Sequence, residues 1–412
     1  MPRTKVSFWE TMKTRFPRWG ANTRGVRVGV DDSGSLAPLV ADYGVTVSND
    51  SALRVTALYA GIRLLSENIA SLPKDVRRKT SAGMISDDRH RAYRLIYIRP
   101  NRYTSSFPFW SVIVTWIKGW GNAYAIIERD ASGNPVALHQ MHPSTLVGLT
   151  VVNGRKWYKF VQPDPDFSFL SGTYSDDDVL HFMELTLDGI RGVNPILYNA
   201  AAIGKSIATE KFAGEFYKRG GNLRGVLEME NSMSDAARAK FLSSFKVSEN
   251  FGTPLLEYGI KYKQLSIDPV AAQLVQSETF SLQDICRILN VPPHMIAELS
   301  HATFSNIEHQ TIQFVQYSLR PIIKRIEEEL ETKLFDSREI GQYDVKFILD
   351  GLLRGDTQAR SAYYHNAILD GYMSRNEVRE LEGLEHKEGL DTMLYPLNSG
   401  KVGENENTEE NG

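Results

Sequence analysis

Acidic and histidine side chains concentrate at one point of the sequence, where Asp176–Asp178 precede His181. Carboxylates and imidazoles bind divalent metal ions, and a bound metal can activate water for hydrolysis. A second pair, His139 and His142, offers the same kind of side chain. Neither group has an established ligand spacing such as H-E-x-x-H, and scattered histidines are usually structural. A nucleic-acid hydrolase with a metal site near Asp178 and His181 is therefore kept as an alternative function.

The tripeptide Gly204–Ser206, "GKS", resembles the end of a phosphate-binding loop. The glycine that such a loop requires five residues earlier is Asn199, and the tripeptide lies inside a helical pattern instead of at a strand-to-helix turn. The sequence also lacks a G-x-S-x-G elbow, a glycine-rich dinucleotide loop and an EF-hand pattern. We therefore expect no enzymatic activity, no cofactor and no metal.

The composition indicates a soluble globular protein, with 42% hydrophobic and 24% charged residues among 412. The net charge of -3 does not indicate a protein that clamps nucleic acid with a bulk positive charge. No run reaches the ~18–20 apolar residues of a membrane span. Residues 1–49 predict an irregular basic arm and residues 397–412 a disordered acidic tail. The single cysteine, Cys286, excludes an internal disulfide and fits a reducing compartment.

The first half of the chain alternates helical and strand patterns. Apolar residues three and four positions apart predict one helix face, namely Val55, Leu58, Ile62, Leu65 and Ile69. On the next predicted helix, three tryptophans are interpreted as core and not as a stacking platform for bases: Trp110, Trp116 and Trp120. Strand patterns then follow at Ala123–Arg129, Pro135–His139, Leu146–Val152, Trp157–Val161 and Val179–Met183. The mixture predicts an α+β fold.

The second half begins with a long helix predicted from Pro195 to Arg219, with Asn194 as its N-cap. A small unit follows, with strands and one helix predicted at Leu223–Glu228, Ser234–Lys246, Pro254–Tyr258 and Lys261–Leu265. Another helix is predicted from Pro269 to Asn290. A polar loop then precedes the longest helical pattern, 307–335, which contains Pro321. Because an interior proline removes a backbone hydrogen bond and clashes with the preceding turn, we predict a kink at this residue.

Several motifs follow one another in a specific order. They are "SALRVTALYAGIRLLSENIASLP", "HRAYRLIYIRPN", "GNAYAIIERDASGNPVALHQMHP", "HFMELTLDGIRGVNPI" and "SLQDICRILNVPPHMIAELSHATFSNIEHQTIQFVQYSLRPIIKRIEEEL". Each motif alone is weak, but the ordered set is specific. Across residues 50–396 the chain resembles an HK97-type portal protein of a tailed bacteriophage or prophage. Lys74 and Asp75 depart from the family pattern, because apolar residues are commoner after the Ser-Leu-Pro motif.

The resemblance implies a portal-type subunit with a mixed α/β wing, a two-helix stem, a small β-containing clip, a long kinked helix and a helical crown. In the family's terms the parts are wing 50–193, first stem helix 194–221, clip 222–266, second stem helix 267–290, tunnel loop 291–306, kinked wing helix and following segment 307–344, and crown 345–396. Portal subunits form a ring, usually dodecameric, at one capsid vertex in the virion. The implied partners are double-stranded DNA, the large terminase, the major capsid protein and head-tail connector or adaptor proteins, without a membrane.

The resemblance also implies which residues face the DNA. The tunnel loop carries one acid and several short polar side chains, suited to transient, sequence-independent contacts. Its candidate residues are Glu298, Ser300, His301, Thr303, Ser305 and Asn306. A weak basic belt around the channel is predicted from Lys211, Lys218, Arg219 and Arg224. The alternative for this belt is an ion-pair face with Glu210 and Glu215. A purely structural adaptor ring that does not conduct DNA is a further alternative function.

Overall fold

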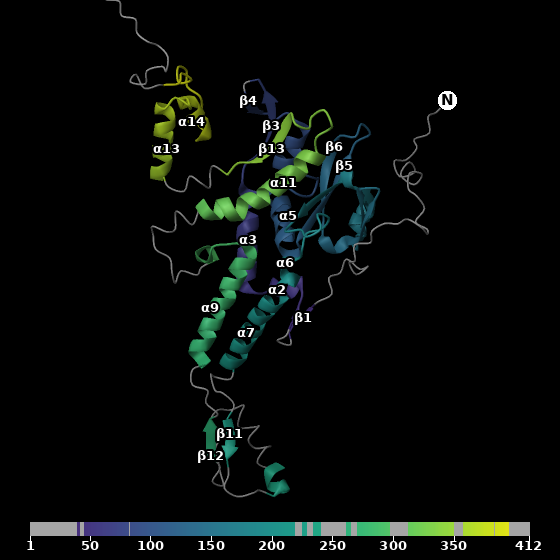
Figure 1. Cartoon of the computed structure of the whole chain (residues 1–412), viewed down its shortest axis with the longest axis vertical. Helices are drawn as coiled ribbons and strands as arrows, with labels where there is room; N and C mark the ends of the chain where they lie inside the picture. The colour runs from purple at the N-terminus through teal and green to yellow at the C-terminus, as the bar shows by residue number, and fades with distance from the viewer. Residues whose placement is uncertain are drawn as a thin grey trace, which may run out of the picture.

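The computed structural model describes residues 39–41, 45–81, 83–218, 225–228, 234–239, 261–264, 270–296, 312–349, 357–382 and 384–394. Its elements follow one long axis (Figure 1). A body of helices and small sheets occupies one end, two helices run side by side from it, and a two-stranded sheet lies beyond them. The predicted α+β class is confirmed by this mixture of elements.

The centre of the body is formed by helices α3 (Thr56–Ser71) and α5 (Ser106–Trp120). The predicted apolar face of α3 is buried, because residues three and four positions apart lie on one side of a helix. Trp110 on α5 is fully buried, and its indole Nε1 donates to the carbonyl of Ile96 at 2.9 Å. Trp116 and Trp120 contact the ring of His142 edge-on. The prediction that the tryptophans belong to the core is thus correct for Trp110.

Three small sheets surround these helices. The first contains β13 (Tyr343–Phe347), β3 (Lys74–Thr80) and β4 (Gly83–Ser86), in that order. The second contains β10 (Val179–Met183), β5 (Asn122–Arg129) and β6 (Pro135–Met141). The third contains β7 (Leu146–Val152), β8 (Arg155–Phe160) and β9 (Gly172–Ser175). Every neighbouring pair is antiparallel, so each sheet ends in edge strands that other parts of the chain must cover.

The two side-by-side helices are α7 (Ala200–Lys218) and α9 (Val270–Leu289), which run in opposite directions (Figure 1). The single helix predicted from Pro195 to Arg219 is wrong in one respect. A short helix α6 (Pro195–Tyr198) comes first, and the helical conformation is interrupted at Asn199, which has φ -107° and ψ 28°. Asn199 donates from its side-chain Nδ2 to the carbonyl of Pro195, and this local bond ends α6.

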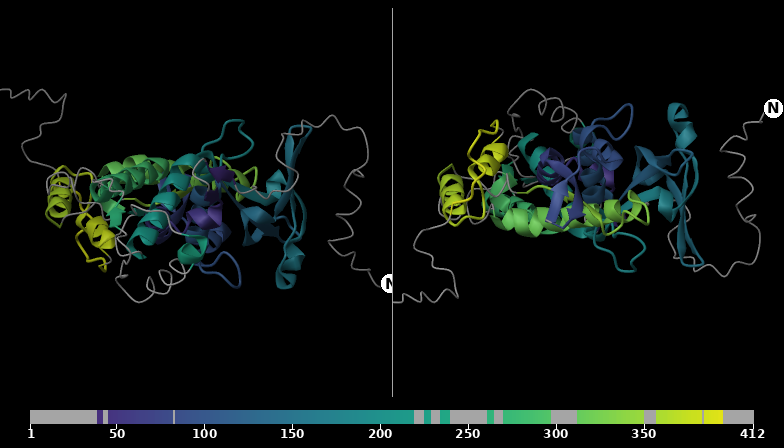
Figure 2. Two further views of the ribbon diagram at one scale, coloured as in Figure 1. Left: turned by 90° about the horizontal axis from the view of Figure 1, so that it is seen from below. Right: turned by 90° about the horizontal axis from the view of Figure 1, so that it is seen from above.

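The far end of the molecule carries β11 (Gly225–Glu228) paired with β12 (Lys261–Gln264). Both strands fall within segments predicted as strands, whereas the predicted strand Pro254–Tyr258 lies outside the described residues. Helices α13 (Thr357–Leu369) and α14 (Arg375–Leu381) lie at one side of the body, opposite the blue strands (Figure 2). These helices agree with the predicted helical character of this part of the chain.

Two expected boundaries need correction. The arm 1–49, expected to be irregular, contains the hairpin β1 (Leu39–Ala41) and β2 (Val45–Val47). Val47 is fully buried, and the hairpin contacts α7, so this part of the arm belongs to the packed structure. The boundary expected between residues 344 and 345 falls inside β13, which pairs with β3. The sheet therefore continues to Phe347.

The departure at Lys74 has a structural explanation. Lys74 is only 5% exposed, and its Nζ donates to the carbonyls of Ala70 and Leu72, both at 2.7 Å. These carbonyls end α3 and lack partners within the helix, so an ammonium group is a suitable donor there. The aliphatic part of the side chain takes the buried place that an apolar residue would fill. Burial lowers the pKa of Lys74 to about 8.

Replacement of Lys74 by Met is expected to change how stability depends on pH. Between about pH 8 and pH 10 the unfolded chain keeps the proton that folded Lys74 releases, because the reference pKa is about 10.4. Stability of the wild type therefore rises with pH in this window, with a contribution of about 2 kcal/mol. Urea unfolding of Lys74→Met should lack that contribution. The exposed Lys79→Met is the control, and identical pH profiles for both variants would contradict the prediction.

Candidate functional site

The residues predicted to face DNA divide into two groups. The loop candidates lie outside the described residues, as do Arg219 and Arg224. Lys211 and Lys218 are described and lie exposed on α7. Because seven residues span about two turns, both side chains lie on the same face of that helix. Glu215 lies between them on this face, four residues after Lys211, and it reduces the positive charge of the face.

Helix α9 is held against the body by close packing. Ile285, Cys286 and Leu289 are buried, and α9 contacts α3 as well as α7. Gly61 on α3 permits this approach, because a Cβ atom there would collide with Leu289 Cδ1. The side chain of Cys286 is therefore enclosed where α9 meets the body. The pair of long helices is therefore joined rigidly to the core at one end.

Pro321 lies in the first turn of α11 (Arg320–Lys333). The preceding turn, η6 (Phe314–Leu319), is a π-helix, in which Arg320 N donates to Val315 O five residues back. A π-helical turn is a recognised cause of helix bending, as is proline. The change of helix type thus coincides with the residue at which the kink was predicted.

Acidic side chains on opposite sides of α11 bind the edges of two sheets. Glu327 accepts from Phe347 N at 2.9 Å, and Glu331 accepts from Val345 N at 3.3 Å, both on edge strand β13. Glu329 accepts from His181 N at 2.7 Å, on edge strand β10. Carboxylates here supply the acceptors that a further strand would otherwise supply. Sequence reasoning missed these roles, and the spacing of Glu327 and Glu331 by one helical turn was the available signal.

The geometry around His181 does not support a metal site. Its Nε2 donates to Asn122 Oδ1 at 3.0 Å, and its Nδ1 accepts from the hydroxyl of Tyr158 at 3.1 Å. Burial lowers the pKa of His181 well below its ordinary value, so the ring is neutral with both nitrogens used. Asp178 pairs with Arg129 Nε at 3.2 Å and accepts from Ser175 Oγ at 3.1 Å. These side chains are structural hydrogen-bonding groups.

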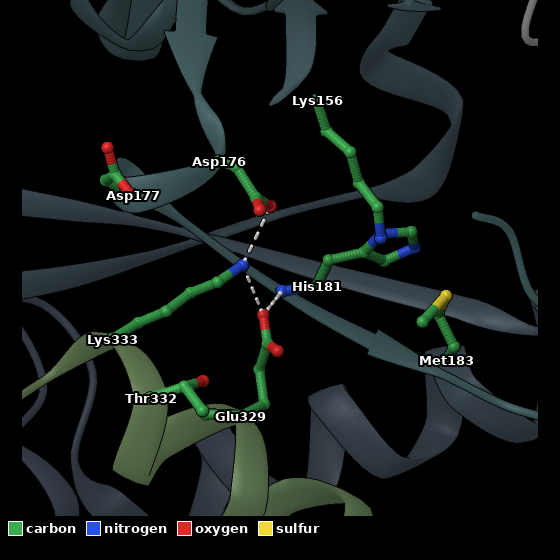
Figure 3. Close-up of a pocket in the computed structure, with 8 residues that line it drawn as sticks. All are labelled: Lys156, Asp176, Asp177, His181, Met183, Glu329, Thr332 and Lys333. Carbon is green, nitrogen blue, oxygen red and sulfur yellow. Dashed lines mark hydrogen bonds and ion pairs between the residues drawn. The ribbon is translucent and has the colours of Figure 1, made fainter. Parts of the chain in front are cut away.

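A polar pocket of roughly 300 Å³ lies beside His181, between β10 and α11 (Figure 3). Its central cation is Lys333, whose Nζ lies 3.1 Å from Asp176 Oδ1 and 2.6 Å from Glu329 Oε1 and donates to Val179 O at 2.7 Å. One ammonium group thus pairs with two carboxylates at the centre of the pocket. Within the described residues, no three His, Cys, Asp or Glu side chains are grouped to hold a metal ion. The arrangement joins α11 to the sheet through ion pairs and hydrogen bonds.

No described helix has the length and apolar character needed to cross a membrane. Helices α7 and α9 are long, but charged side chains such as Lys205, Lys211 and Asp284 interrupt their apolar residues. Two described helices carry residues that were predicted to matter for the channel. Helix α7 carries the exposed lysines, and α11 contains Pro321 and follows the π-helical turn η6.

A family model for phage portal proteins matches residues 56–383. The portal protein of Enterobacteria phage HK97 is 25% identical over 411 residues, which cover 95% of this chain and 92% of that protein. The probable portal protein of Streptomyces phage phiC31 is 30% identical over 388 residues, which cover 89% of this chain and 82% of that protein.

Solved structures show the same fold. An HK97 family phage portal protein from Corynebacterium diphtheriae superposes with a TM-score of 0.55 at 17% identity, covering 75% of this chain and 98% of that chain. A chain from the neck of a native gene transfer agent particle, computed with C12 symmetry, superposes with a TM-score of 0.54 at 17% identity, covering 86% and 97%. The ordered motifs, the two long antiparallel helices and the family match agree, and the chain belongs to the HK97-type phage portal proteins.

Proposed function

We propose that this protein is the subunit of a ring-shaped portal at one vertex of a capsid, through which double-stranded DNA passes during packaging and ejection. The observation that carries the proposal is the family match over residues 56–383, in a subunit whose antiparallel helices α7 and α9 extend from a packed body. Helices in this position can surround a channel when copies are repeated about an axis. The ring count of twelve is supported by the likeness to the neck computed with C12 symmetry.

The charge pattern of α7 suits passage of DNA. Each phosphate that a cation neutralises adds affinity, so a strongly basic channel would hold DNA tightly at low salt. The exposed face of α7 carries Lys211 and Lys218 with Glu215 between them. Such a face attracts the duplex weakly and without reading its sequence. A conduit needs this combination, because the DNA must slide.

Exposed apolar side chains support assembly with other copies. Leu187 and Tyr198 are each 74% exposed on the chain that leads from the body to α7, and Phe280 on α9 is 56% exposed. Contiguous apolar patches mark surfaces that become buried on association, and we propose that these side chains contribute to such contacts between copies. We propose that the large terminase docks on residues 222–266, and that the major capsid protein and head-tail connector proteins contact other parts of the ring.

Cryo-electron microscopy of the purified full chain tests the proposal. We expect rings with a central hole wide enough for a duplex of ~20 Å. Monomers or compact dimers without a channel, across several salt and protein concentrations, would overturn the portal role. Assembled rings that occupy the capsid vertex but never conduct DNA would instead favour the structural adaptor. Nuclease activity lost in Asp178→Ala with assembly intact would favour the hydrolase, against the hydrogen bonding described above.

Replacement of both Lys211 and Lys218 by Gln is expected to weaken DNA binding by the assembled ring. The slope of log K against log salt should become shallower by about 0.9 for each phosphate that the ring no longer neutralises. Glu215→Gln on the same helix face is the matched control, and it should strengthen binding. If the lysines instead serve ion pairs between subunits, the double variant will dissociate the ring at moderate salt and leave the DNA affinity of the remaining rings unchanged.

A further inference from the structure

The C-terminal end of helix α9 is closed by its own backbone. Asn290 adopts the left-handed conformation, with φ 56°. Its N–H group donates to Arg287 O at 3.2 Å, and Val291 N donates to Cys286 O at 2.9 Å. This pair of bonds is a Schellman motif, in which the left-handed residue is usually Gly and sometimes Asn. Glycine would satisfy the backbone here equally well, so the amide side chain of Asn290 needs a separate explanation.

The explanation lies at the π-helical turn η6, which precedes Pro321 in the long helix. Pro321 has no N–H group, and the carbonyl of Tyr317, four residues earlier, therefore lacks its ordinary α-helical donor. Asn290 Nδ2 donates to this carbonyl at 2.8 Å. In the reverse direction, Ser318 Oγ donates to the carbonyl of Asn290. Two hydrogen bonds thus join the end of α9 to the π-helical turn, across 27 and 28 residues of sequence.

We propose that Asn290 is a positioning residue. Its side-chain amide supplies the donor that Pro321 lacks and so fixes the π-helical turn η6 against the end of α9. The surroundings favour a fixed joint over a free hinge. Ser318 is 6% exposed and the adjacent Leu319 is fully buried, and both α9 and η6 contact α3. The π-helical turn therefore changes only together with the end of α9.

The joint also connects α9 with α11, two helices that are bound to different parts of the fold. Beyond Pro321, α11 is bound to the edges of two sheets through Glu327, Glu329 and Glu331. Before Asn290, α9 runs alongside α7 for most of its length. A displacement of α9 is thus transmitted to the sheets through Asn290, the π-helical turn η6 and α11. In the proposed portal, this joint sets the position of the stem relative to the body, and this consequence rests on the proposed function.

A double-mutant cycle tests the coupling in the full chain. Asn290→Gly keeps the left-handed conformation and removes the amide. Alone, it should lower the ratio of folded to unfolded protein about two- to tenfold, since one hydrogen bond at the surface is lost. Pro321→Ala restores an N–H group to the helix. In the Pro321→Ala background, Asn290→Gly should lower the ratio of folded to unfolded protein by less than about twofold, because the helix now supplies a donor of its own.

The cycle separates positioning from a general structural role. The entropy that glycine adds to the unfolded chain is the same in both backgrounds and cancels. An equal cost of Asn290→Gly with Pro321 and with Ala at that position would overturn the proposal. Hydrogen exchange provides a second measure where unfolding is irreversible. Amides of residues 312–322 should exchange faster in Asn290→Gly than in the wild type, whereas the double variant should match Pro321→Ala alone.

The cycle does not require ring formation, so the two proposals fail in different ways. Coupling between Asn290 and Pro321 without any ring in the microscope would support the joint and overturn the portal role. Rings with a channel but no coupling would support the portal role and overturn the joint. Asn290→Asp provides a further check, because an acceptor would then face the carbonyl of Tyr317. When Pro321 is present, Asn290→Asp should lower the free energy of unfolding more than Asn290→Gly does.

Discussion

Gly192→Ala is expected to destabilise the folded protein by about 3 kcal/mol or more, which places it among the largest single-residue effects. A Cβ atom at this position would collide with the carbonyl oxygen of Gly121 and lie 2.9 Å from Glu184 N. Both neighbours are backbone atoms, so neither can move aside as a flexible side chain would. Chemical unfolding measured by circular dichroism provides the free energy of unfolding.

A large effect is expected because this contact joins the segment before α6 to the end of α5 and the start of β5. Asn122 holds the same glycine from both sides, since its Oδ1 accepts from Gly192 N and its Nδ2 donates to Gly192 O, both at 2.8 Å. Gly121 O in turn accepts from Glu184 N at 2.9 Å. A displacement of Gly192 breaks this set of hydrogen bonds together, so the steric cost adds to the cost of unpaired buried groups.

Gly119→Ala is the matched control for this prediction. Gly119 lies in α5, two residues before Gly121, and a Cβ atom there meets nothing within 4 Å. Alanine is favoured over glycine in a helix, so this variant should be neutral or more stable by up to about 1 kcal/mol. A Gly192→Ala protein within about 1 kcal/mol of the wild type would show that the loop accommodates the methyl group, contrary to the prediction.

Glu327→Ala should destabilise the protein by about 2–4 kcal/mol, because it leaves partners of a buried carboxylate without an acceptor. Glu327 is 5% exposed, with Phe347 N at 2.9 Å from Oε1 and Lys346 Nζ at 2.9 Å from Oε2. The amide of Phe347 on edge strand β13 would be buried and unpaired. The free energy of unfolding measures the loss, and hydrogen exchange should show faster exchange in 343–347.

The neighbouring Glu328→Ala provides the control on the same helix. Glu328 is exposed and pairs with Lys324 one turn earlier, at 3.3 Å. Such surface pairs contribute little, so the change should stay within about 0.5 kcal/mol. Equal effects of the two variants would mean that general acidity of α11 matters, and not the specific bonds to β13.

Local patterns were sufficient for much of the body. The bounds of β7 and β10 agree with the strands predicted at Leu146–Val152 and Val179–Met183. The apolar spacing on α3 identified its buried face, because helical period and burial are both encoded within one short stretch. The strands predicted at Ala123–Arg129 and Pro135–His139 correspond to β5 and β6, and in the turn between them Asp130 Oδ1 accepts from Ser132 N and Asn134 N.

Patterns failed where the partner of a side chain lies far away in the sequence. The run "KRIEEELETK" has the composition of a solvated helix face, yet three of its glutamates bind backbone N–H groups of edge strands. Lys74 is a related case, since its Nζ lies over the ring of Phe347, on a strand far away in the chain. Asp178 and His181 had the residue types of a metal site, but Asp178 pairs with Arg129, and both ring nitrogens of His181 are used in hydrogen bonds to Asn122 and Tyr158.

The sequence by itself determined the α+β class, the family and the order of the elements, and it placed Pro321 inside a long helical pattern. These depend on periodicity, caps and proline chemistry, which act between residues a few positions apart. Only the tertiary structure decided what compensates for that proline and what the acidic helix binds. Both depend on hydrogen bonds between residues far apart in the sequence, because a donor or acceptor has a partner only once the elements that carry them are packed together.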